Sequence, residues 1–266
     1  MLGLGTNFGS LSAQESASSN RFSYPTETNA YAVNFDGSND RSTSGSASGV
    51  NSMTHELNGT NWSLQFYFKT ATAGSLSNGF FLWKASSFST YFRITLTNGS
   101  LGVTSQGVSG GGYGINTTFS TNCAVNTWYH IILTSDGSGT NRLTKCYLDG
   151  SLVTTTSQSD IASSKEVVPS SGNPGFANLA GFYHFEYTVD QWATWSEALS
   201  AAEVLELSTN TPDLTQNAGN YISSSRLQRY YKMDEGSGTS LADSSGNNRT
   251  ALTLVNGPTF TTNTPF

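Results

Sequence analysis

Charged residues are scarce in this chain of 266 residues: they make up 11% of it, whereas roughly a quarter is usual for soluble domains. Twelve Lys and Arg face eighteen Asp and Glu, so the net charge is −6, and the basic residues are scattered singly. Nucleic acid and anionic membrane surfaces are therefore not expected partners, because no basic stripe exists to neutralise their phosphates.

Cysteine and histidine are also rare. The two cysteines, Cys123 and Cys146, form no C-x-x-C motif, and the three histidines lie far apart in the sequence. This excludes a disulfide-rich scaffold and gives no zinc signature. Two free thiols are the favoured interpretation, and a single disulfide remains an alternative.

Long apolar runs are missing as well. The sequence contains no run of about 18 apolar residues, so no membrane-spanning helix is predicted. The start, "MLGLGTNFGSLSAQESASSN", has neither a basic segment nor an apolar segment of about 7–15 residues, so a secretory signal peptide is not expected. A protein of this kind that acts outside the cell would leave by another route, such as assembly into a particle that lysis releases.

What the chain does contain is aromatic residues, 12% of the total, in runs that alternate with polar residues. "NWSLQFYFKT" places Trp62, Leu64, Phe66 and Phe68 on one face and polar residues on the other, which predicts a half-buried strand. Further such runs are "YAVNFDGSND", "GFFLWKAS", "YFRITLTNGSLGVTS", "NTWYHIILTSDGSGTNRLTKCYLDGSLVTTT" and "GFYHFEYTVDQWATW". Turns rich in Gly, Asn and Asp join them, so an all-β antiparallel sandwich is expected.

One short helix interrupts this pattern. Ser200 and Glu203 form the capping-box spacing, and Pro212 stops the segment, which predicts a helix over residues 201–209. Two turns of helix are not stable alone in water. We therefore expect it to dock on the sandwich through its apolar residues, Leu199, Val204, Leu205 and Leu207.

Composition divides the chain into three parts. Residues 1–29 are polar and predict an N-terminal arm; residues 30–210 hold the strands and the helix; residues 211–266 form a C-terminal tail. The two or three strands expected in the tail cannot bury a core of their own. The tail is therefore expected to pack onto the sandwich.

Several stretches carry a family resemblance. "YAVNFDGSND", "WSLQFYFKT", "NTWYHIILTSDGSGTNRLTKCYLDGSLVTT" and "VDQWATWSEALSAAEVLEL" follow one another in the order of a laminin G-like domain. The chain thus resembles the concanavalin A-like lectin/glucanase superfamily over about residues 30–210. The resemblance implies an antiparallel jelly-roll β-sandwich with one short helix toward its C-terminal side, which seals one edge.

The resemblance also implies one structural calcium ion. The positions that match the acidic sites of the family are Asp36 and Asp190. Asp243 lies in a separate loop, "DSSGNN", whose oxygen-bearing side chains suit a hard cation such as calcium. The alternative is that these aspartates cap turns by accepting hydrogen bonds from nearby backbone groups. No other cofactor is expected.

Sugar binding requires an exposed aromatic platform, for which Trp83, Tyr91, Tyr113 and Trp192 are candidates. For Trp83 and Trp192 a position in the core is the favoured interpretation. Glycosidases of the superfamily use a Glu-x-Asp-x-x-Glu strand, which this chain lacks. Glu186 and Asp190 come nearest to this pattern, but they lie four positions apart, about 13 Å along a strand, which is too far for either glycosidase mechanism. No catalytic residue is predicted, and a glycoside hydrolase stays a remote alternative.

The chain combines a short "MLGLG" start, one laminin G-like domain, and a tail with "DSSGN" and a proline near its end. This layout resembles that of uncharacterised virion proteins of tailed bacteriophages, especially marine ones. That resemblance implies a non-enzymatic virion structural protein, such as a head decoration, head fibre or tail component, made in the host cytoplasm. Its expected partners are other virion proteins, reached through residues 1–29, and host-surface glycans. A free carbohydrate-binding module or adhesin is the alternative, and a homo-oligomer remains open because no heptad pattern specifies one.

Overall fold

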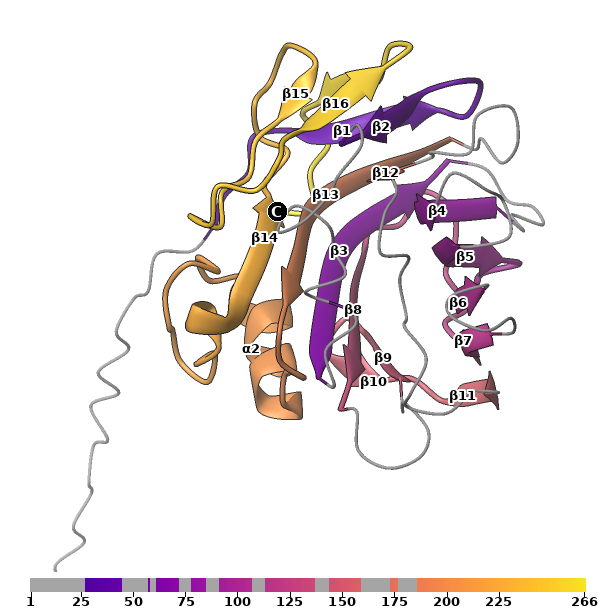
Figure 1. The fold of residues 1–266 in the computed structure, drawn as a ribbon, viewed down its shortest axis with the longest axis vertical. Coiled ribbons are helices and arrows are strands. Elements are labelled where there is room, and N and C mark those ends of the chain that lie inside the picture. Colours follow the sequence, from indigo (N-terminus) through magenta and orange to yellow (C-terminus); the bar gives the residue numbers. More distant parts are fainter. Residues whose placement is uncertain are drawn as a thin grey trace, which may run out of the picture.

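The computed structural model describes residues 27–44, 57, 61–71, 78–84, 91–106, 113–136, 144–158, 173–176 and 186–266. Within them the chain forms two large antiparallel sheets packed face to face, a small third sheet and a flanking helix (Figure 1). The expected all-β antiparallel sandwich with one short helix is confirmed. None of the described helices is both long enough and apolar enough to span a bilayer.

The larger sheet has eight strands among the described residues. Its path in space is β10 (Ser151–Leu152), β9 (Thr144–Leu148), β8 (Tyr129–Ser135), β3 (Trp62–Thr70), β13 (Glu186–Trp195), β1 (Ala32–Asp36) and β17 (Thr259–Thr261), with β14 (Leu227–Tyr231) also paired to β13.

The second sheet faces it with six strands. Their order is β11 (Thr155–Gln158), β7 (Tyr113–Phe119), β6 (Ser100–Gln106), β5 (Tyr91–Thr97), β4 (Asn78–Lys84) and β12 (Asn173–Phe176). β5 and β6 are joined by the turn at Asn98 and Gly99, both with positive φ, as the Asn-Gly dipeptide predicts.

The C-terminal segment completes the sheets. β14 pairs with the second half of β13, and β17 pairs with β1. β16 (Leu252–Val255) lies between β15 (Ser240–Leu241) and β2 (Arg41–Thr43) in the small third sheet. Residues after 210 therefore share hydrogen-bonded sheets with strands from the start of the chain.

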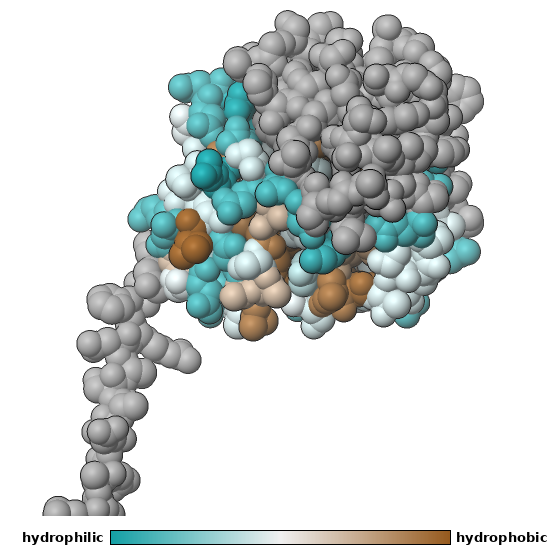
Figure 2. Space-filling model, turned by 60° about the horizontal axis from the view of Figure 1, so that its bottom comes forward, coloured by the Kyte–Doolittle hydropathy of each residue, from teal (hydrophilic) through white to brown (hydrophobic). Residues whose placement is uncertain are grey.

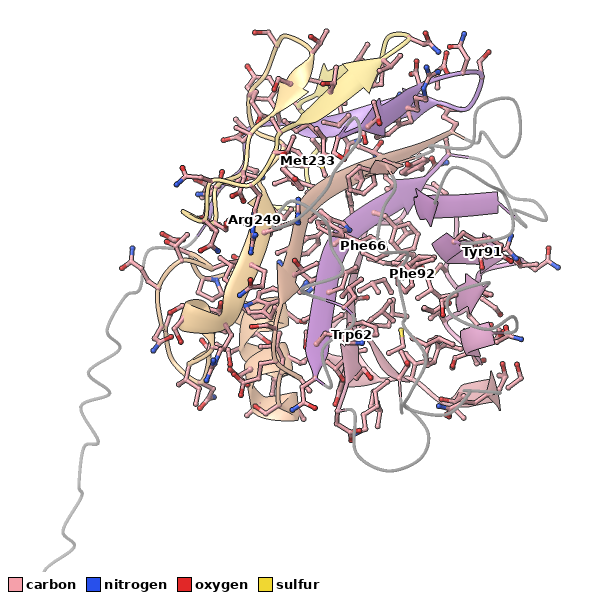
Figure 3. All side chains as sticks on the ribbon, viewed as in Figure 1. Trp62, Phe66, Tyr91, Phe92, Met233 and Arg249 are labelled. Atoms are coloured by element: carbon pink, nitrogen blue, oxygen red, sulfur yellow. The ribbon has the colours of Figure 1, made fainter. Side chains whose placement is uncertain are left out.

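The main core lies between the two large sheets. Alternate residues of β3, β5, β6 and β8 meet there, including Leu64, Phe66, Phe92, Val103 and Ile131, all essentially without exposed surface. Figure 3 shows Phe92 directed toward Phe66 in the interior. Burial of this apolar surface supplies most of the favourable free energy of folding.

A second apolar cluster covers the outer face of the eight-stranded sheet. The helix α2 (Ala201–Asn210) and the segment that follows it bury Ala193, Trp195, Tyr221 and Tyr230 there. Figure 1 shows α2 against this sheet, on the side away from β4–β7. The prediction that β3 is only half buried is therefore wrong, because α2 and the C-terminal segment cover its polar face.

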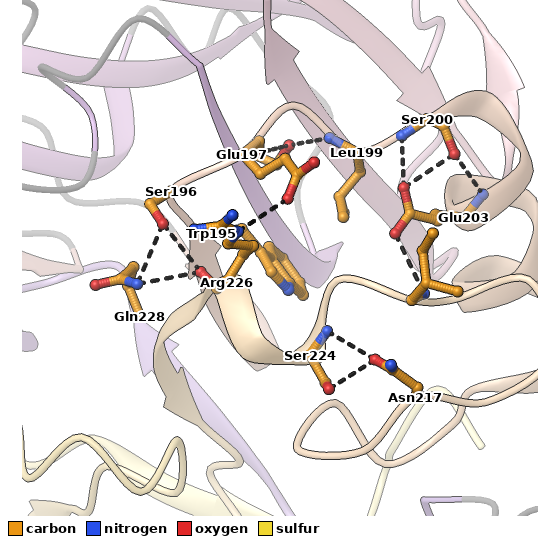
Figure 4. Close-up of polar contacts among 12 residues, drawn as sticks. Trp195, Ser196, Glu197, Leu199, Ser200, Glu203, Asn217, Ser224, Arg226 and Gln228 are labelled. Atoms are coloured by element: carbon orange, nitrogen blue, oxygen red, sulfur yellow. Dashed lines mark hydrogen bonds and ion pairs between the residues drawn. The ribbon is translucent and has the colours of Figure 1, made fainter.

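The capping box that the sequence predicts for α2 is confirmed. The Ser200 hydroxyl accepts from Glu203 N–H, while the Glu203 carboxylate accepts from Ser200 N–H (2.9 Å) (Figure 4). Glu203 also accepts from the N–H of Ile222 (3.3 Å), which ties the helix start to the following segment. Leu199, Val204 and Leu207 are buried in the second cluster, as expected for docking residues.

Leu205 is a correction to the docking prediction. Its side chain is 56% exposed, because it lies outside the helix stripe that Val204 and Leu207 bury. The other large apolar side chains that are exposed in the described part are Val125, Leu152, Ile222 and Phe266. Figure 2 shows the apolar patches near α2 as separate spots among hydrophilic residues, which is ordinary for a protein surface.

Candidate functional site

The outer surface of the six-stranded sheet is the candidate binding surface. On β5 burial alternates: Phe92, Ile94 and Leu96 face the core, whereas Tyr91, Arg93 and Thr95 are partly exposed on the other side. In Figure 3 Tyr91 lies at the outer edge of the molecule, and Phe92 points inward. We call the surface made by Tyr91, Arg93, Thr95, Thr104, Asn116 and Thr118 the outer sheet face.

The strand register sets these residues in rows. Arg93 pairs with Thr104 on β6, and Thr104 pairs with Asn116 on β7. Neighbouring strands lie about 4.8 Å apart, so the row spans roughly 10 Å. Thr104 is only 9% exposed, so the row presents the partly exposed Arg93 guanidinium and Asn116 amide, groups that can hydrogen-bond sugar hydroxyls.

Arg93 and Tyr91 form an aromatic–cation pair on this face. The Arg93 guanidinium carbon lies 5.0 Å from the centre of the Tyr91 ring, within the range of a cation–π contact. Arg93 Nε is buried and has no hydrogen-bond partner. None of the ion pairs found among the described residues involves Arg93.

The four aromatic residues predicted for sugar binding have different positions. Tyr91 is on the outer sheet face. The backbones of Tyr91 on β5 and Tyr113 on β7 both pair with Gln106 on β6, so the three residues lie in one row across the sheet. The backbone of Trp83 on β4 pairs with that of Phe92 on β5. The side chains of Trp83 and Tyr113 are outside the described part.

Trp192 is a correction. Its side chain is 1% exposed and packs in the main core between the sheets, so it has no surface to offer a sugar. The cause is a bulge in β13: Asp190 pairs with Tyr67 and Ala193 with Gln65, so one extra residue stands on β13. Gln191 takes a positive φ of 47° at this bulge, which turns Trp192 inward.

The same bulge creates a buried polar cluster around Asp190, which is 0% exposed. Asp190 Oδ1 accepts hydrogen bonds from Asn29 Nδ2 (2.9 Å) and from the Gln191 N–H (2.9 Å). Asn29 Nδ2 also donates to the Lys232 carbonyl (2.6 Å). Asp234 accepts from the N–H groups of Ala30 (2.8 Å) and Tyr31 (3.0 Å), so the cluster fastens the first described residues to the C-terminal segment.

The protonated form of Asp190 fits this cluster. Burial raises its pKa well above the ordinary carboxyl value, the hydrogen bonds from Asn29 and Gln191 oppose the rise, and the nearby charge of Asp234 adds to it. Asp190 Oδ2 and Asn29 Oδ1 are both buried without a partner. A proton on Asp190 Oδ2 would make that oxygen a hydrogen-bond donor. Asn29 Oδ1 could then accept it, and this acceptor lies on the same side chain that already donates to Asp190 Oδ1.

The three aspartates predicted for calcium are not brought together. Asp190 and Asn29 offer two open oxygens, whereas calcium takes six to eight oxygen ligands. Asp36 is exposed and accepts from the Ser38 N–H (2.8 Å), a turn contact. Within the described residues no group of three or more His, Cys, Asp or Glu could hold a metal ion.

Asp243 is a correction to the calcium prediction. Its Oδ1 accepts from the N–H groups of Tyr230 (3.1 Å) and Ser245 (3.1 Å), and its Oδ2 accepts from Ser245 Oγ (2.9 Å) and Arg249 N–H (2.9 Å). A carboxylate has about four lone-pair sites, so protein donors already fill them. Asp243 therefore organises its loop and joins it to β14.

A second buried polar cluster centres on His130. Its ring stacks on Tyr67 with centroids 4.0 Å apart, Nδ1 lies 2.9 Å from Ser208 Oγ, and Nε2 lies 3.3 Å from Gln65 Oε1. Burial lowers the pKa of His130 to about 3. In a neutral ring, Nε2 donates a hydrogen bond to Gln65 Oε1 and Nδ1 accepts one from the Ser208 hydroxyl, so both ring nitrogens are satisfied. His130 thereby joins α2 to the sheet.

The other reactive groups among the described residues show no catalytic arrangement. Cys123 and Cys146 are free thiols, and burial raises the pKa of Cys123 to about 11, which disfavours the reactive thiolate. Glu186 is exposed at the start of β13, while Asp190 is fully buried. These two carboxyl groups lie in different environments and do not flank a common cleft of the kind that a glycosidase needs.

Comparison with known proteins adds the family. A model described as "Concanavalin A-like lectin/glucanases superfamily" (Laminin_G_3) matches residues 36–205. A solved structure of a Bacteroides ovatus protein, provisionally described as carbohydrate-binding, matches with a TM-score of 0.56 and 17% identity over 88% of this chain. This chain spans 60% of that protein, and the similarity shows a shared fold.

A SAP-like pentraxin from Limulus polyphemus matches with a TM-score of 0.44 and 15% identity, over 79% of this chain and 94% of the pentraxin. No curated protein matches the sequence. The family match covers more than half of the chain and includes β3, the β8–β9 hairpin, β13 and the first turn of α2. The protein therefore belongs to the Laminin_G_3 family of the concanavalin A-like lectin/glucanase superfamily.

Proposed function

We propose that this protein is a non-enzymatic, glycan-binding lectin-like protein that uses the outer sheet face. The observation that carries the proposal is the row Arg93–Thr104–Asn116, with Tyr91 beside it, on a sheet surface that α2 does not cover. Aromatic rings and fixed polar side chains are the two elements that sugar sites combine. The described carbohydrate-binding role of the Bacteroides ovatus protein, which has the same fold, agrees with this proposal.

The described residues of the outer sheet face contain no suitable carboxylate pair, which favours binding over hydrolysis. The row on the outer sheet face contains no acid, and Asp190 belongs to a buried structural cluster on the opposite sheet. A glycosidase needs two carboxyl groups on either side of the bond it cleaves. The described part of the outer sheet face therefore offers hydrogen-bonding groups without a catalytic acid and base.

The proposal is tested by a glycan array followed by calorimetry on hits, with the purified full chain. Tyr91→Ala and Asn116→Ala should each weaken binding about tenfold or more, because a stacked ring or a buried hydrogen bond contributes roughly 1–2 kcal/mol. Phe266→Ala is the matched control, since Phe266 is an exposed aromatic residue that contacts Tyr67 of the other sheet. Equal losses in all three variants would contradict a site on the outer sheet face.

A role in a bacteriophage particle is the second proposal, as a head decoration, head fibre or tail component. It is supported by the resemblance of the chain's layout and by the way in which the first described residues are held. Glu27 donates its N–H to the Thr211 carbonyl (2.8 Å), and its carboxylate pairs with Lys232 (2.7 Å). The predicted arm, residues 1–29, is thus held to the domain at residues 27–29, and residues 1–26 would contact other virion proteins.

Mass spectrometry of purified virions tests this second proposal. Hundreds of copies per particle indicate a head decoration or fibre, and a few copies indicate a tail component that presents the glycan site to a host. Removal of residues 1–26 should then abolish incorporation while the domain stays folded. Complete absence from virions would refute the particle role and would leave a free carbohydrate-binding module or adhesin.

A further inference from the structure

Arg93 is a charged group for which the described residues provide no carboxylate partner. It lies on β5, inside the six-stranded sheet, with its guanidinium over the Tyr91 ring and its Nε buried without a partner. A buried donor without an acceptor is costly, and the cost is larger for a charged group. The described ion pairs elsewhere show that basic residues of this chain do find carboxylates.

Arg93 is partly exposed although its Nε is buried, so the two terminal nitrogens of its guanidinium are the donors that a ligand can reach. Thr104 and Asn116 follow Arg93 across the sheet, so the charge stands at one end of a row of neutral hydrogen-bonding groups. The guanidinium is planar and presents a fork of N–H groups that matches a carboxylate in two-pronged fashion. The Tyr91 ring limits the directions that the fork can take, which reduces the entropy lost when an anion binds.

We propose that Arg93 makes the outer sheet face selective for glycans that carry a sugar carboxylate, such as uronic acids. The carboxylate would accept two hydrogen bonds from the Arg93 fork, while ring hydroxyls contact the partly exposed Asn116. The net charge of the chain is −6, so long-range attraction does not favour acidic glycans, and selectivity must come from this local cation. The inference rests on the proposed glycan-binding function and specifies its ligand class.

The experiment compares acidic glycans with their own neutral forms. Oligogalacturonate, alginate and hyaluronate oligosaccharides are each tested beside the carboxyl-reduced counterpart, with the full chain and isothermal calorimetry. The wild type should bind at least one acidic oligosaccharide ten or more times more tightly than its reduced form. Arg93→Gln should remove that preference, and Arg93→Lys should keep part of it, because a lysine supplies charge without the fork.

Arg226→Gln is the matched control, because it removes one positive charge from an exposed arginine that pairs with Glu197 on the other sheet. It should leave the preference unchanged, and circular dichroism checks that each variant is folded. Equal binding of acidic and reduced forms, with loss in Tyr91→Ala but not in Arg93→Gln, would overturn this inference and leave the proposed function intact. No binding to any acidic or neutral glycan would refute both, and preference for sulfated over carboxylated glycans would refute the carboxylate assignment.

Discussion

His130 should make the protein less stable in mild acid by an amount that the structure allows us to work out. Its pKa is about 3 in the folded chain, because the ring is buried, and about 6.5 in an unfolded chain. Between these values the unfolded chain binds a proton that the folded chain does not. The free energy of unfolding therefore falls by about 1.4 kcal/mol for each pH unit below 6.5, or about 3 kcal/mol by pH 4.

The variant His130→Phe isolates this contribution. It keeps a ring against Tyr67 but leaves Ser208 and Gln65 without their partner, so it should be less stable than the wild type at pH 7 by roughly 1–3 kcal/mol. Between pH 7 and pH 4 the gap should shrink by about 3 kcal/mol, because only the wild type contains the titrating ring. Urea denaturation at pH 4, 5, 6 and 7 measures both curves.

Other titrating groups do not affect the difference in stability between the wild type and His130→Phe. Asp149 and Asp190 both have raised pKa values in the fold, and both are present in either protein, so their contributions cancel in the difference. Tyr67→Phe is a control that alters the same cluster without changing its titration in this range. A gap that stays constant from pH 7 to pH 4 would refute the reasoning that His130 is buried and neutral.

Three further predictions concern the rest of the fold. Asp190→Asn should be at least as stable as the wild type at pH 7, and its advantage should shrink toward pH 4, because the raised pKa of the Asp190 carboxyl favours folding in acid and that contribution is lost as the pH rises. Neither calcium nor a chelator should change the melting temperature of this variant. Strong stabilisation of the wild type by calcium would show that an ionised Asp190 binds the ion. Ser200→Ala should lower the free energy of unfolding by about 1 kcal/mol through loss of the helix cap, and an unchanged urea midpoint would contradict the capping box. Leu207→Ala should cost about 2–4 kcal/mol and Leu205→Ala less than about 0.5 kcal/mol, measured by the same denaturation; similar costs would show that Leu205 is buried after all.

The sequence was informative where local pattern decides the structure. Alternation identified β3 and β5, and the Ser200 and Glu203 spacing identified the start of α2, because strand and cap geometry depend on neighbouring residues. The same pattern failed on the second face of β3. Ser63 is buried because it accepts from Leu199 N–H (2.8 Å) and donates to the Glu197 carbonyl (2.7 Å), contacts that join distant parts of the chain.

The candidate site was predictable only in part. Alternation in "YFRITLT" puts Tyr91 and Arg93 on one face, and the sequence marks Tyr91 as a candidate because aromatic residues form sugar platforms, whereas nothing in the sequence marks Arg93. Its significance depends on the missing counter-charge and on the register with Thr104, which are visible only once the strands are paired. Trp192 was misplaced for a similar reason, since a single extra residue in β13 reverses which face a side chain occupies.

The most direct test of the central claim is the dissociation constant of one glycan for the wild type, Tyr91→Ala and Phe266→Ala, measured side by side on folded protein. The account predicts about tenfold or greater weakening with Tyr91→Ala and no change with Phe266→Ala, because only Tyr91 lies on the outer sheet face. Glycan binding that survives Tyr91→Ala unchanged would contradict the account and would move the search to another surface of the molecule.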